Sequence, residues 1–289
     1  MKWANLIFWL GLVVISITPS SAHAWNYVCV DPGHGGDDDG THGHVYGVLE
    51  KDVNLGVGIM LYSYLAVDGW NPILTRDIDI TLSRELRADT ANKANGGYGV
   101  DAFVCIHHNA PYDTTDTLTN GTETFWCNAD STDSHWVRRD TTDTLATKVY
   151  YKLLDKFHYP PRGVKLRCGS RWKILKLTKM GSTLSEASFL TCAEVERKFY
   201  LYFDEECEEE AEAIFRGTVS YLLHAGITVV KNSYSGGDLG ELIISKWDWF
   251  PDICFDPDTA ASPCTTCWLG GFLGETYCLE AITPQWMGG

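Results

Sequence analysis

The chain has 289 residues, of which 45% are hydrophobic and 12% aromatic, so it can form one large domain or a medium domain with a smaller appendage. This composition excludes a mainly disordered or fibrous protein. The formal net charge of -15 excludes binding to nucleic acid or to anionic membranes by bulk attraction, so any anionic polymer must be recognised locally.

The first 24 residues are expected to be a secretory signal peptide rather than part of the fold. Lys2 precedes an apolar run over residues 6–17, Pro19 breaks the run, and residues 22–24 (AHA) offer the small side chains that a signal peptidase reads. The alternative is an uncleaved membrane anchor, but about 12 apolar residues are fewer than the roughly 20 that span a bilayer. We therefore expect cleavage after Ala24 and export to the periplasm or the extracellular space, with no lipid anchor and no later membrane insertion.

Strands and helices are predicted to alternate over residues 25–231. In chain order, the pattern predicts a strand at 25–30, a helix at 52–67, strands at 71–75 and 102–106 around a helix at 81–94, a strand at 122–127, a helix at 144–157, strands at 171–176 and 182–185, and a helix at 205–224. The entirely apolar segment 102–106 is typical of a strand covered on both faces. The alternation predicts an α/β domain with a central, mostly parallel or mixed sheet flanked by helices.

Residues 232–289 differ in composition and are expected to be a linker followed by a short Cys/Trp-rich extension. Residues 232–240 are rich in Gly, Ser and Asp, and four cysteines and four tryptophans follow. The cysteines could form two disulfides or bind one zinc ion, and export favours disulfides. The tryptophans could stack on sugar rings or cover the main domain, and the shortness of the segment favours the second interpretation.

Ten cysteines in an exported chain indicate an oxidising compartment, although their connectivity cannot be read from the sequence. Cys29 and Cys105 lie within apolar strand-like runs, so we expect them to be free buried thiols.

Polar residues follow three of the predicted strands at the point where each strand ends. These residues are His34, His107 and Glu186. Ligands bind beyond the carboxyl ends of strands in open α/β sheets, so we expect the three side chains to share one rim. Glu50 follows the loop that leaves His34 and can return to the same rim. Two imidazoles and one carboxylate form a common catalytic zinc set that leaves a fourth position open for water.

Six short segments spread over residues 27–226 carry a more specific signal. They are residues 31–36 (DPGHGG), 50–55 (EKDVNL), 75–77 (TRD) with Arg87 and 91–92 (AN), 106–109 (IHHN), 121–125 (GTETF) and 184–190 (LSEASFL). These segments resemble, in the same order, the motifs of zinc-dependent N-acetylmuramoyl-L-alanine amidases of the LytC/AmiC type. One such motif would be weak evidence, whereas six in order are specific.

The resemblance implies that His34, Glu50 and His107 are zinc ligands and that Glu186 is the catalytic carboxylate. The implied reaction is hydrolysis of the amide between the lactyl group of muramic acid and L-alanine in peptidoglycan. The residue types fit this chemistry, because zinc lowers the pKa of a bound water to about 7 and makes it a nucleophile. A carboxylate beside the metal can act as general base on that water and then protonate the leaving amine. Outside these motifs, the same side chains would more often be structural.

Several neighbours depart from the family's pattern. His108 replaces a small residue, and because adjacent strand residues point to opposite faces, only His107 is expected to bind the metal. His108 is then a residue that supports the site, faces substrate or is exposed. Cys105 shares the face of His107, and we expect it in the core. Ser188 and Cys192 stand where the family more often has glycine and asparagine.

Three polar stretches are expected to lie on the surface. His42 and His44 are predicted to be solvated, and the acidic run 204–212 lacks the glycine turn of a calcium loop, which favours a solvated helix face. Some family members block the site with an extra helix after the strand at 121–125. Only a short polar stretch follows here, so we expect an open site, and a large activity gain on deleting residues 129–140 would contradict this.

Two other functions remain open. The chain could be a catalytically silent relative that binds peptidoglycan and activates another hydrolase, or a zinc peptidase acting on another exported substrate. Retention of all four key residues favours the enzyme. We expect peptidoglycan as the partner, an activator protein as a further possible partner, and a monomer.

Overall fold

The computed structural model describes residues 26–113, 115–128, 142–227, 268–269 and 277–278. The predicted signal peptide, the stretch 129–140 and most of the C-terminal extension lie outside the described residues. Within the extension, β7 (Trp268–Leu269) and β8 (Tyr277–Cys278) pair as a two-stranded antiparallel ladder.

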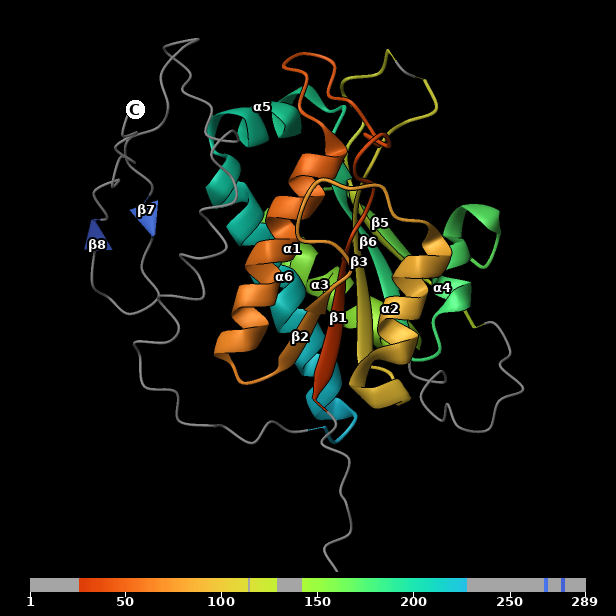
Figure 1. Ribbon diagram of the computed structural model, residues 1–289. Helices are drawn as coiled ribbons and strands as arrows, with labels where there is room; N and C mark the ends of the chain where they lie inside the picture. Colours follow the sequence, from red (N-terminus) through yellow and green to blue (C-terminus); the bar gives the residue numbers. More distant parts are fainter. Residues whose placement is uncertain (1–25, 114, 129–141, 228–267, 270–276, 279–289) are drawn as a thin grey trace, which may run out of the picture.

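Six strands form one mixed sheet in the order β2-β1-β3-β6-β4-β5 (Figure 1). The strands are β1 (Tyr27–Pro32), β2 (Asn71–Leu74), β3 (Ala102–Asn109), β4 (Thr122–Trp126), β5 (Pro161–Leu166) and β6 (Gly181–Phe189). β1 is parallel to β2 and β3, and β3 is parallel to β6, whereas β4 runs antiparallel to β6 and parallel to β5. The predicted mixed α/β sheet is therefore confirmed.

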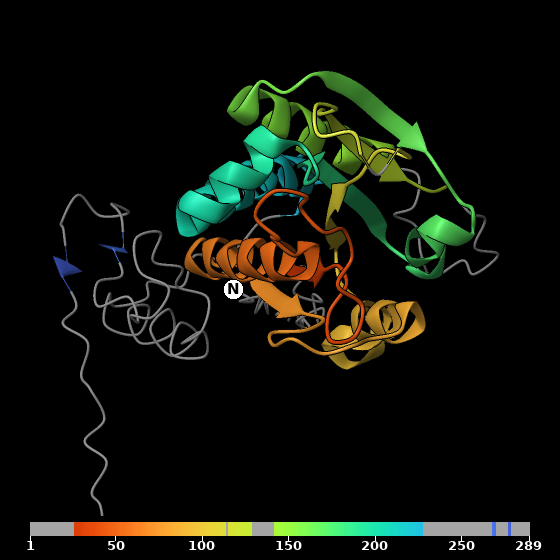
Figure 2. The same ribbon diagram turned by 90° about the horizontal axis from the view of Figure 1, so that it is seen from above.

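Helices cover both faces of this sheet (Figures 1 and 2). One layer consists of α1 (Glu50–Val67), α3 (Thr142–Phe157) and α6 (Phe203–His224), with α5 (Ala193–Leu201) leading into α6; the other consists of α2 (Arg84–Gly97) and α4 (Lys173–Leu177). Alternate residues of β3 supply the two cores. Val104 and Ile106 pack with the first layer, and Phe103 and Cys105 pack with the second. This double burial explains why the strand reads as an unbroken apolar run.

The predicted strand at 171–176 is wrong. The chain there forms a short 3-10 helix (Ser170–Trp172) that leads into α4. Ile174 and Leu175 are consecutive and both buried. A helix can bury adjacent residues against its neighbours, whereas a strand with one exposed face buries every second residue. α4 makes its helix contacts with α2, so tertiary packing decides the conformation of a segment too short for a clear period.

Two elements were not predicted. β5 lies at the edge of the sheet, begins with Pro161, contains Gly163 and leaves its ends exposed, so it lacks the apolar pattern of an interior strand. α5 has only nine residues and follows β6 directly. In addition, α2 begins at Arg84 instead of residue 81, because the Ser83 side chain caps it by accepting a hydrogen bond from the Leu86 N–H at 3.2 Å.

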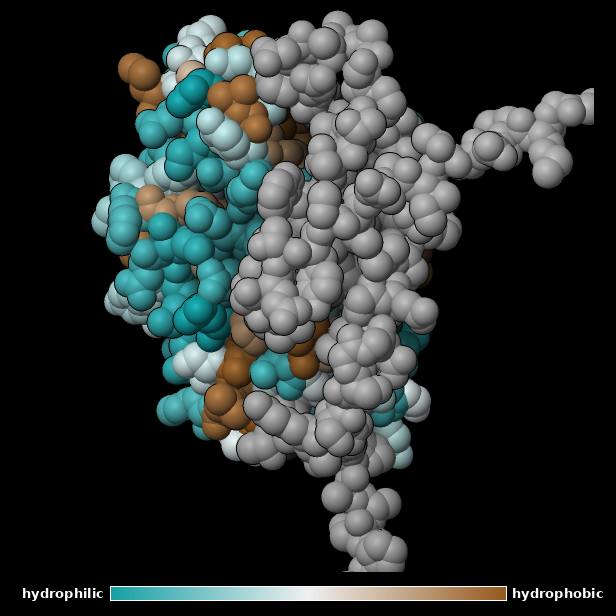
Figure 3. Space-filling model, turned by 90° about the vertical axis from the view of Figure 1, so that its left-hand side faces the viewer, coloured by the Kyte–Doolittle hydropathy of each residue, from teal (hydrophilic) through white to brown (hydrophobic). Residues whose placement is uncertain are grey.

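Among the described cysteines, Cys127 and Cys168 form a disulfide that joins the end of β4 to the segment before α4. Cys29 and Cys105 are free and buried, as predicted, and so are Cys192 and Cys207. The described helices include none with the length and apolarity needed to cross a membrane. In Figure 3, hydrophilic residues occupy most of the coloured surface and hydrophobic ones form separate small patches.

Candidate metal centre and catalytic carboxylate

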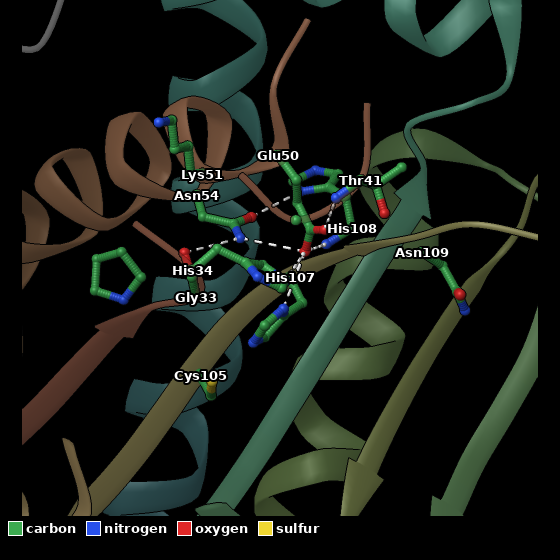
Figure 4. Close-up of polar contacts among 12 residues, drawn as sticks. Gly33, His34, Thr41, Glu50, Lys51, Asn54, Cys105, His107, His108 and Asn109 are labelled. Atoms are coloured by element: carbon green, nitrogen blue, oxygen red, sulfur yellow. Dashed lines mark hydrogen bonds and ion pairs between the residues drawn. The ribbon is translucent and has the colours of Figure 1, made fainter. Parts of the chain in front are cut away.

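The structure brings His34, Glu50 and His107 together at the carboxyl edge of the sheet. His34 follows β1, Glu50 is the first residue of α1, and His107 lies in β3. One possible ligand atom from each residue lies within 4.8 Å of the others. His34 Nε2 is 3.3 Å and His107 Nδ1 is 2.9 Å from Glu50 Oε1 (Figure 4). The three side chains therefore lie together at one rim of the sheet.

Further contacts orient the two groups that come from the loop and the helix. Asp38 Oδ1 lies 2.8 Å from His34 Nδ1, which leaves Nε2 as the nitrogen that faces Glu50. Glu50 Oε2 accepts a hydrogen bond from the Thr41 N–H at 2.7 Å, and Oε1 accepts one from the His108 N–H at 3.0 Å. A carboxylate that fixes the outer ring nitrogen of a histidine is a frequent partner of a metal-ligating imidazole.

Two glycines leave the space that these side chains occupy. A Cβ on Gly33 would lie 2.3 Å from His107 Cε1 and 2.4 Å from its Nε2. A Cβ on Gly40 would lie 2.6 Å from both Glu50 Oε2 and His34 Cδ2. His34 itself has φ +59°, a left-handed conformation that is uncommon outside glycine and often stores strain at functional sites. The DPGHGG segment thus supplies the space and backbone shape of the site as well as one of its side chains.

We expect Gly33→Ala to lower zinc affinity at least ~10-fold, because the added Cβ would displace the ring of His107, a proposed zinc ligand. Competition with a zinc-binding dye measures this directly. Gly169→Ala is the matched control, since its Cβ would meet only Trp172, at 4.0 Å. Unchanged zinc affinity in Gly33→Ala would show that the His107 ring does not need its present position.

Glu50 and the two histidines shift each other's pKa values. Burial opposes ionisation of Glu50, but hydrogen bonds and the charges of His107 and His34 hold the pKa of its carboxyl well below the usual range. Burial lowers the pKa of His107 despite the nearby Glu50 carboxylate, whereas the Glu50 and Asp38 carboxylates raise the pKa of His34 despite its burial, so a metal bound there must displace a proton from His34. An ionised carboxylate and neutral imidazoles are the forms that bind a metal.

The set of donors fits zinc. Two imidazole nitrogens and one carboxylate oxygen are a common catalytic zinc set. The Asp38 contact holds His34 in an orientation that presents Nε2, and Glu50 is 2% exposed and anchored by two backbone N–H groups. The residues present could therefore hold a single zinc ion.

Glu186 lies beside this triad on the neighbouring strand. In the parallel pairing of β3 and β6, Glu186 is in register with His107, and in the pairing of β4 and β6 it is in register with Glu123. Its Oε2 is buried and has no hydrogen-bond partner among the described residues. Burial raises the pKa of the Glu186 carboxyl well above its usual range, and the negative charges of Glu50 and Glu123 raise it further. A buried polar atom without a partner is costly, so its retention points to a use.

A cleft of about 1020 Å³ joins these groups. Its lining includes His34, Glu50, His107, Glu123, Glu186 and Arg171. All four residues predicted for the site therefore line one cavity that is open to solvent on one side.

The His108 side chain points away from the triad and contacts it only indirectly, through Asn54. Its side chain is fully buried, with Nδ1 3.0 Å from Asn54 Oδ1 and Nε2 2.9 Å from Glu210 Oε2. Asn54 in turn donates a hydrogen bond to Glu50 Oε1 at 3.3 Å. The interpretation of His108 as exposed is wrong, and the expectation that it supports the site without joining His107 on the metal agrees with this geometry.

We expect Glu210→Ala to lower the free energy of unfolding by about 3 kcal/mol, because it leaves the buried His108 ring without its partner. Urea unfolding followed by circular dichroism measures the change. Glu209→Ala, one residue away on the same helix, is the control, since Glu209 is half exposed and lies 3.9 Å from Lys156. Equal stability of the two variants would contradict the role assigned to the pair.

Residues that the sequence alone did not single out complete the site. Asp38 and Asn54 each stand four positions after a predicted ligand, a spacing that could have indicated them. Glu210 gave no such signal, and its burial corrects the prediction that the whole run 204–212 is solvated, because Cys207, Glu210 and Ala211 face inward on α6.

The remaining predicted neighbours agree with the structure. His42 and His44 are exposed. The Cys105 thiol is buried, donates to Asp31 Oδ2 at 2.9 Å and is not part of the metal group.

Comparisons with known proteins point in one direction. Residues 28–217 match the family model described as N-acetylmuramoyl-L-alanine amidase. The chain is 33% identical over 196 residues to N-acetylmuramoyl-L-alanine amidase LytC of Bacillus subtilis, an alignment that covers 67% of this chain and 35% of LytC. The chain thus matches about a third of the length of that relative.

Solved structures agree. The amidase AmiC2 of Nostoc punctiforme aligns with a TM-score of 0.57 and 31% identity over 68% of this chain and 97% of that one. The CwlD amidase of Clostridioides difficile, solved in complex with the GerS lipoprotein, aligns with a TM-score of 0.56 and 26% identity over 69% of this chain and 99% of that one. Since the family model spans more than half of the chain, the chain belongs to the N-acetylmuramoyl-L-alanine amidase family.

Proposed function

We propose that this chain is an exported zinc hydrolase that cuts the amide between N-acetylmuramic acid and L-alanine in peptidoglycan. The observation that carries the proposal is the juxtaposition of a two-histidine, one-carboxylate group with a buried, unpartnered carboxylate in one cleft. Family membership supports the choice of bond, because the related proteins are named for that amide.

In this proposal His34, Glu50 and His107 hold the metal. When bound, zinc would supply a water of lowered pKa and polarise the scissile carbonyl. The protein's own part is to keep the ligands in place before the metal arrives. Asp38 turns the ring of His34, and the backbone N–H groups of Thr41 and His108 hold both oxygens of Glu50.

Glu186 is the proton carrier of the proposed reaction. Its unpartnered Oε2 faces no competing donor among the described residues, so it is free to accept a proton from the attacking water. Burial raises the pKa of this carboxyl, which favours the protonated form that can donate to the departing nitrogen of L-alanine. An amine is a poor leaving group without that proton, which is why one carboxylate acts first as base and then as acid.

The surrounding organisation also stands as a proposal. Residues 25–231 form the catalytic domain after removal of residues 1–24, and residues 232–289 are an appended extension. Export places the enzyme in the periplasm or at the extracellular cell wall. The CwlD neighbour was solved with a lipoprotein partner, which supports looking for an activator protein here as well.

Digestion of purified peptidoglycan followed by mass spectrometry tests the function. The expected products are intact glycan strands and free stem peptides that begin with L-alanine, and their release should stop when a chelator is added. Binding to peptidoglycan without release would identify a silent, regulatory relative. Cleavage of other exported polypeptides but not of peptidoglycan would identify a zinc peptidase.

A further inference from the structure

The cleft beside Glu186 is lined by charged side chains of both signs. The arginine and lysine side chains that line it are Arg84, Arg87, Arg162, Arg171 and Lys173. The carboxylates that line the same cleft are Asp31, Asp38, Glu50, Glu85, Glu123 and Glu186, so only a cation without a carboxylate partner is available to an anionic ligand.

Three of these cations are already engaged by carboxylates of the chain itself. The pairs are Arg87 with Asp31 at 2.8 Å, Arg162 with Glu123 at 3.5 Å, and Lys173 with Glu85. Arg84 and Arg171 are exposed, and neither has a carboxylate within 4.0 Å over residues 26–113, 115–128 and 142–227. Their charges are therefore available to a ligand in the cleft.

Arg171 lies in the segment 168–173, which contacts with the rest of the domain hold in place. Its guanidinium carbon lies 6.0 Å from the centre of the Trp172 ring, which in turn lies 5.3 Å from the ring of Phe125 on β4. The Cys127–Cys168 disulfide fixes the start of this segment, and the Lys173–Glu85 ion pair ties its end to α2. The backbone that carries Arg171 is therefore held in place, so only its side chain has to be ordered when it binds a ligand.

The Arg171 side chain is also close to the reacting centre. Arg171, Glu186, His34 and His107 all line the same cleft. A ligand group bound by Arg171 would consequently lie near the point at which the amide is cut.

We propose that Arg171, assisted by Arg84, forms a subsite for a free carboxylate of the peptidoglycan stem peptide. This inference rests on the proposed function and adds the substrate class to it. The lactyl group on the sugar side of the scissile bond is already consumed in the amide, whereas the peptide side carries carboxylates beyond L-alanine. Arginine suits this role, since its planar guanidinium binds a carboxylate through two parallel hydrogen bonds. The enzyme therefore prefers stem peptides whose second residue keeps a free α-carboxylate over peptides in which that group is an amide.

Calorimetry with two synthetic stem peptides tests the subsite on the zinc-loaded mature chain. The peptides differ only in a carboxylate or an amide on the second residue. Wild type should bind the carboxylate peptide at least ~10-fold more tightly, about the 1.4 kcal/mol that corresponds to a tenfold ratio. Arg171→Gln should reduce the preference below about 3-fold, and Arg171→Lys should retain part of it.

Arg197→Gln is the matched control, because Arg197 is an exposed arginine on α5 that does not line the cleft. It should keep the wild-type preference. Equal affinities of wild type for the two peptides, no binding of either, or an undiminished preference in Arg171→Gln would each overturn the subsite. Failure of the amidase proposal would instead show as retained peptide preference without cleavage of peptidoglycan.

Discussion

Glu50→Gln is expected to abolish stable zinc binding and to reduce amidase activity at least ~100-fold. Glutamine preserves the volume of the side chain and one oxygen for the backbone N–H groups, but it removes the charge that neutralises the metal. The buried setting makes this charge decisive, since Glu50 is 2% exposed and both imidazoles approach its Oε1. Metal content after dialysis, measured by mass spectrometry, should fall from about one zinc per chain to near zero.

Asp52→Asn is the control for this variant, because Asp52 lies in the same helical turn but outside the metal group and the cleft lining. It should retain zinc and activity. Retention of stoichiometric zinc in Glu50→Gln would mean that the carboxylate is only a structural acceptor at the start of α1.

Glu186→Gln is expected to keep zinc and to lower kcat by roughly 10²–10⁴-fold, the usual contribution of general acid–base catalysis. The amide retains the shape of the side chain but can neither take the proton of water nor deliver one to the leaving amine. Because Glu186 does not belong to the metal group, zinc content should match the wild type. Rates on a soluble muropeptide, measured with zinc content on the same sample, separate these two properties.

Glu194→Gln provides the comparison for Glu186, since it changes an exposed carboxylate on α5. Its rate should equal that of the wild type. Loss of zinc together with activity in Glu186→Gln would assign Glu186 to the metal, and an unchanged kcat would remove it from the mechanism.

The sheet and most helices could be predicted because their sequences carry clear periods. The apolar run that becomes β3 and the strand that precedes His34 are buried on both faces, and this burial leaves an unbroken apolar signature. The segment at 171–176 and the edge strand β5 could not be predicted because they lack such an apolar pattern. Both are short and partly exposed, so contacts with α2 and β4 decide their conformation.

The proximity of the four candidate side chains could be predicted from the sequence. Strand ends determine where His34, His107 and Glu186 emerge, and the parallel register of β3 and β6 places the last two side by side. The supporting contacts were not predictable, because they join distant segments. Glu210 reaches His108 from a helix about a hundred positions later in the chain, and no local pattern encodes that approach.

The two arginines of the proposed subsite illustrate the same limit. Arg171 and Arg84 are remote in sequence, lie in two separate predicted elements at 171–176 and 81–94, and belong to none of the motifs. Only the fold shows that they line one cleft with Glu186.

Anomalous diffraction at the zinc edge, from crystals of the mature chain grown with zinc, tests the central claim most directly. The account predicts one peak at about 2.0–2.2 Å from a nitrogen of His34, an oxygen of Glu50 and a nitrogen of His107, with Glu186 beside the site but outside ligand distance. A peak on other residues, or no peak at this rim in crystals that bind zinc, would contradict it.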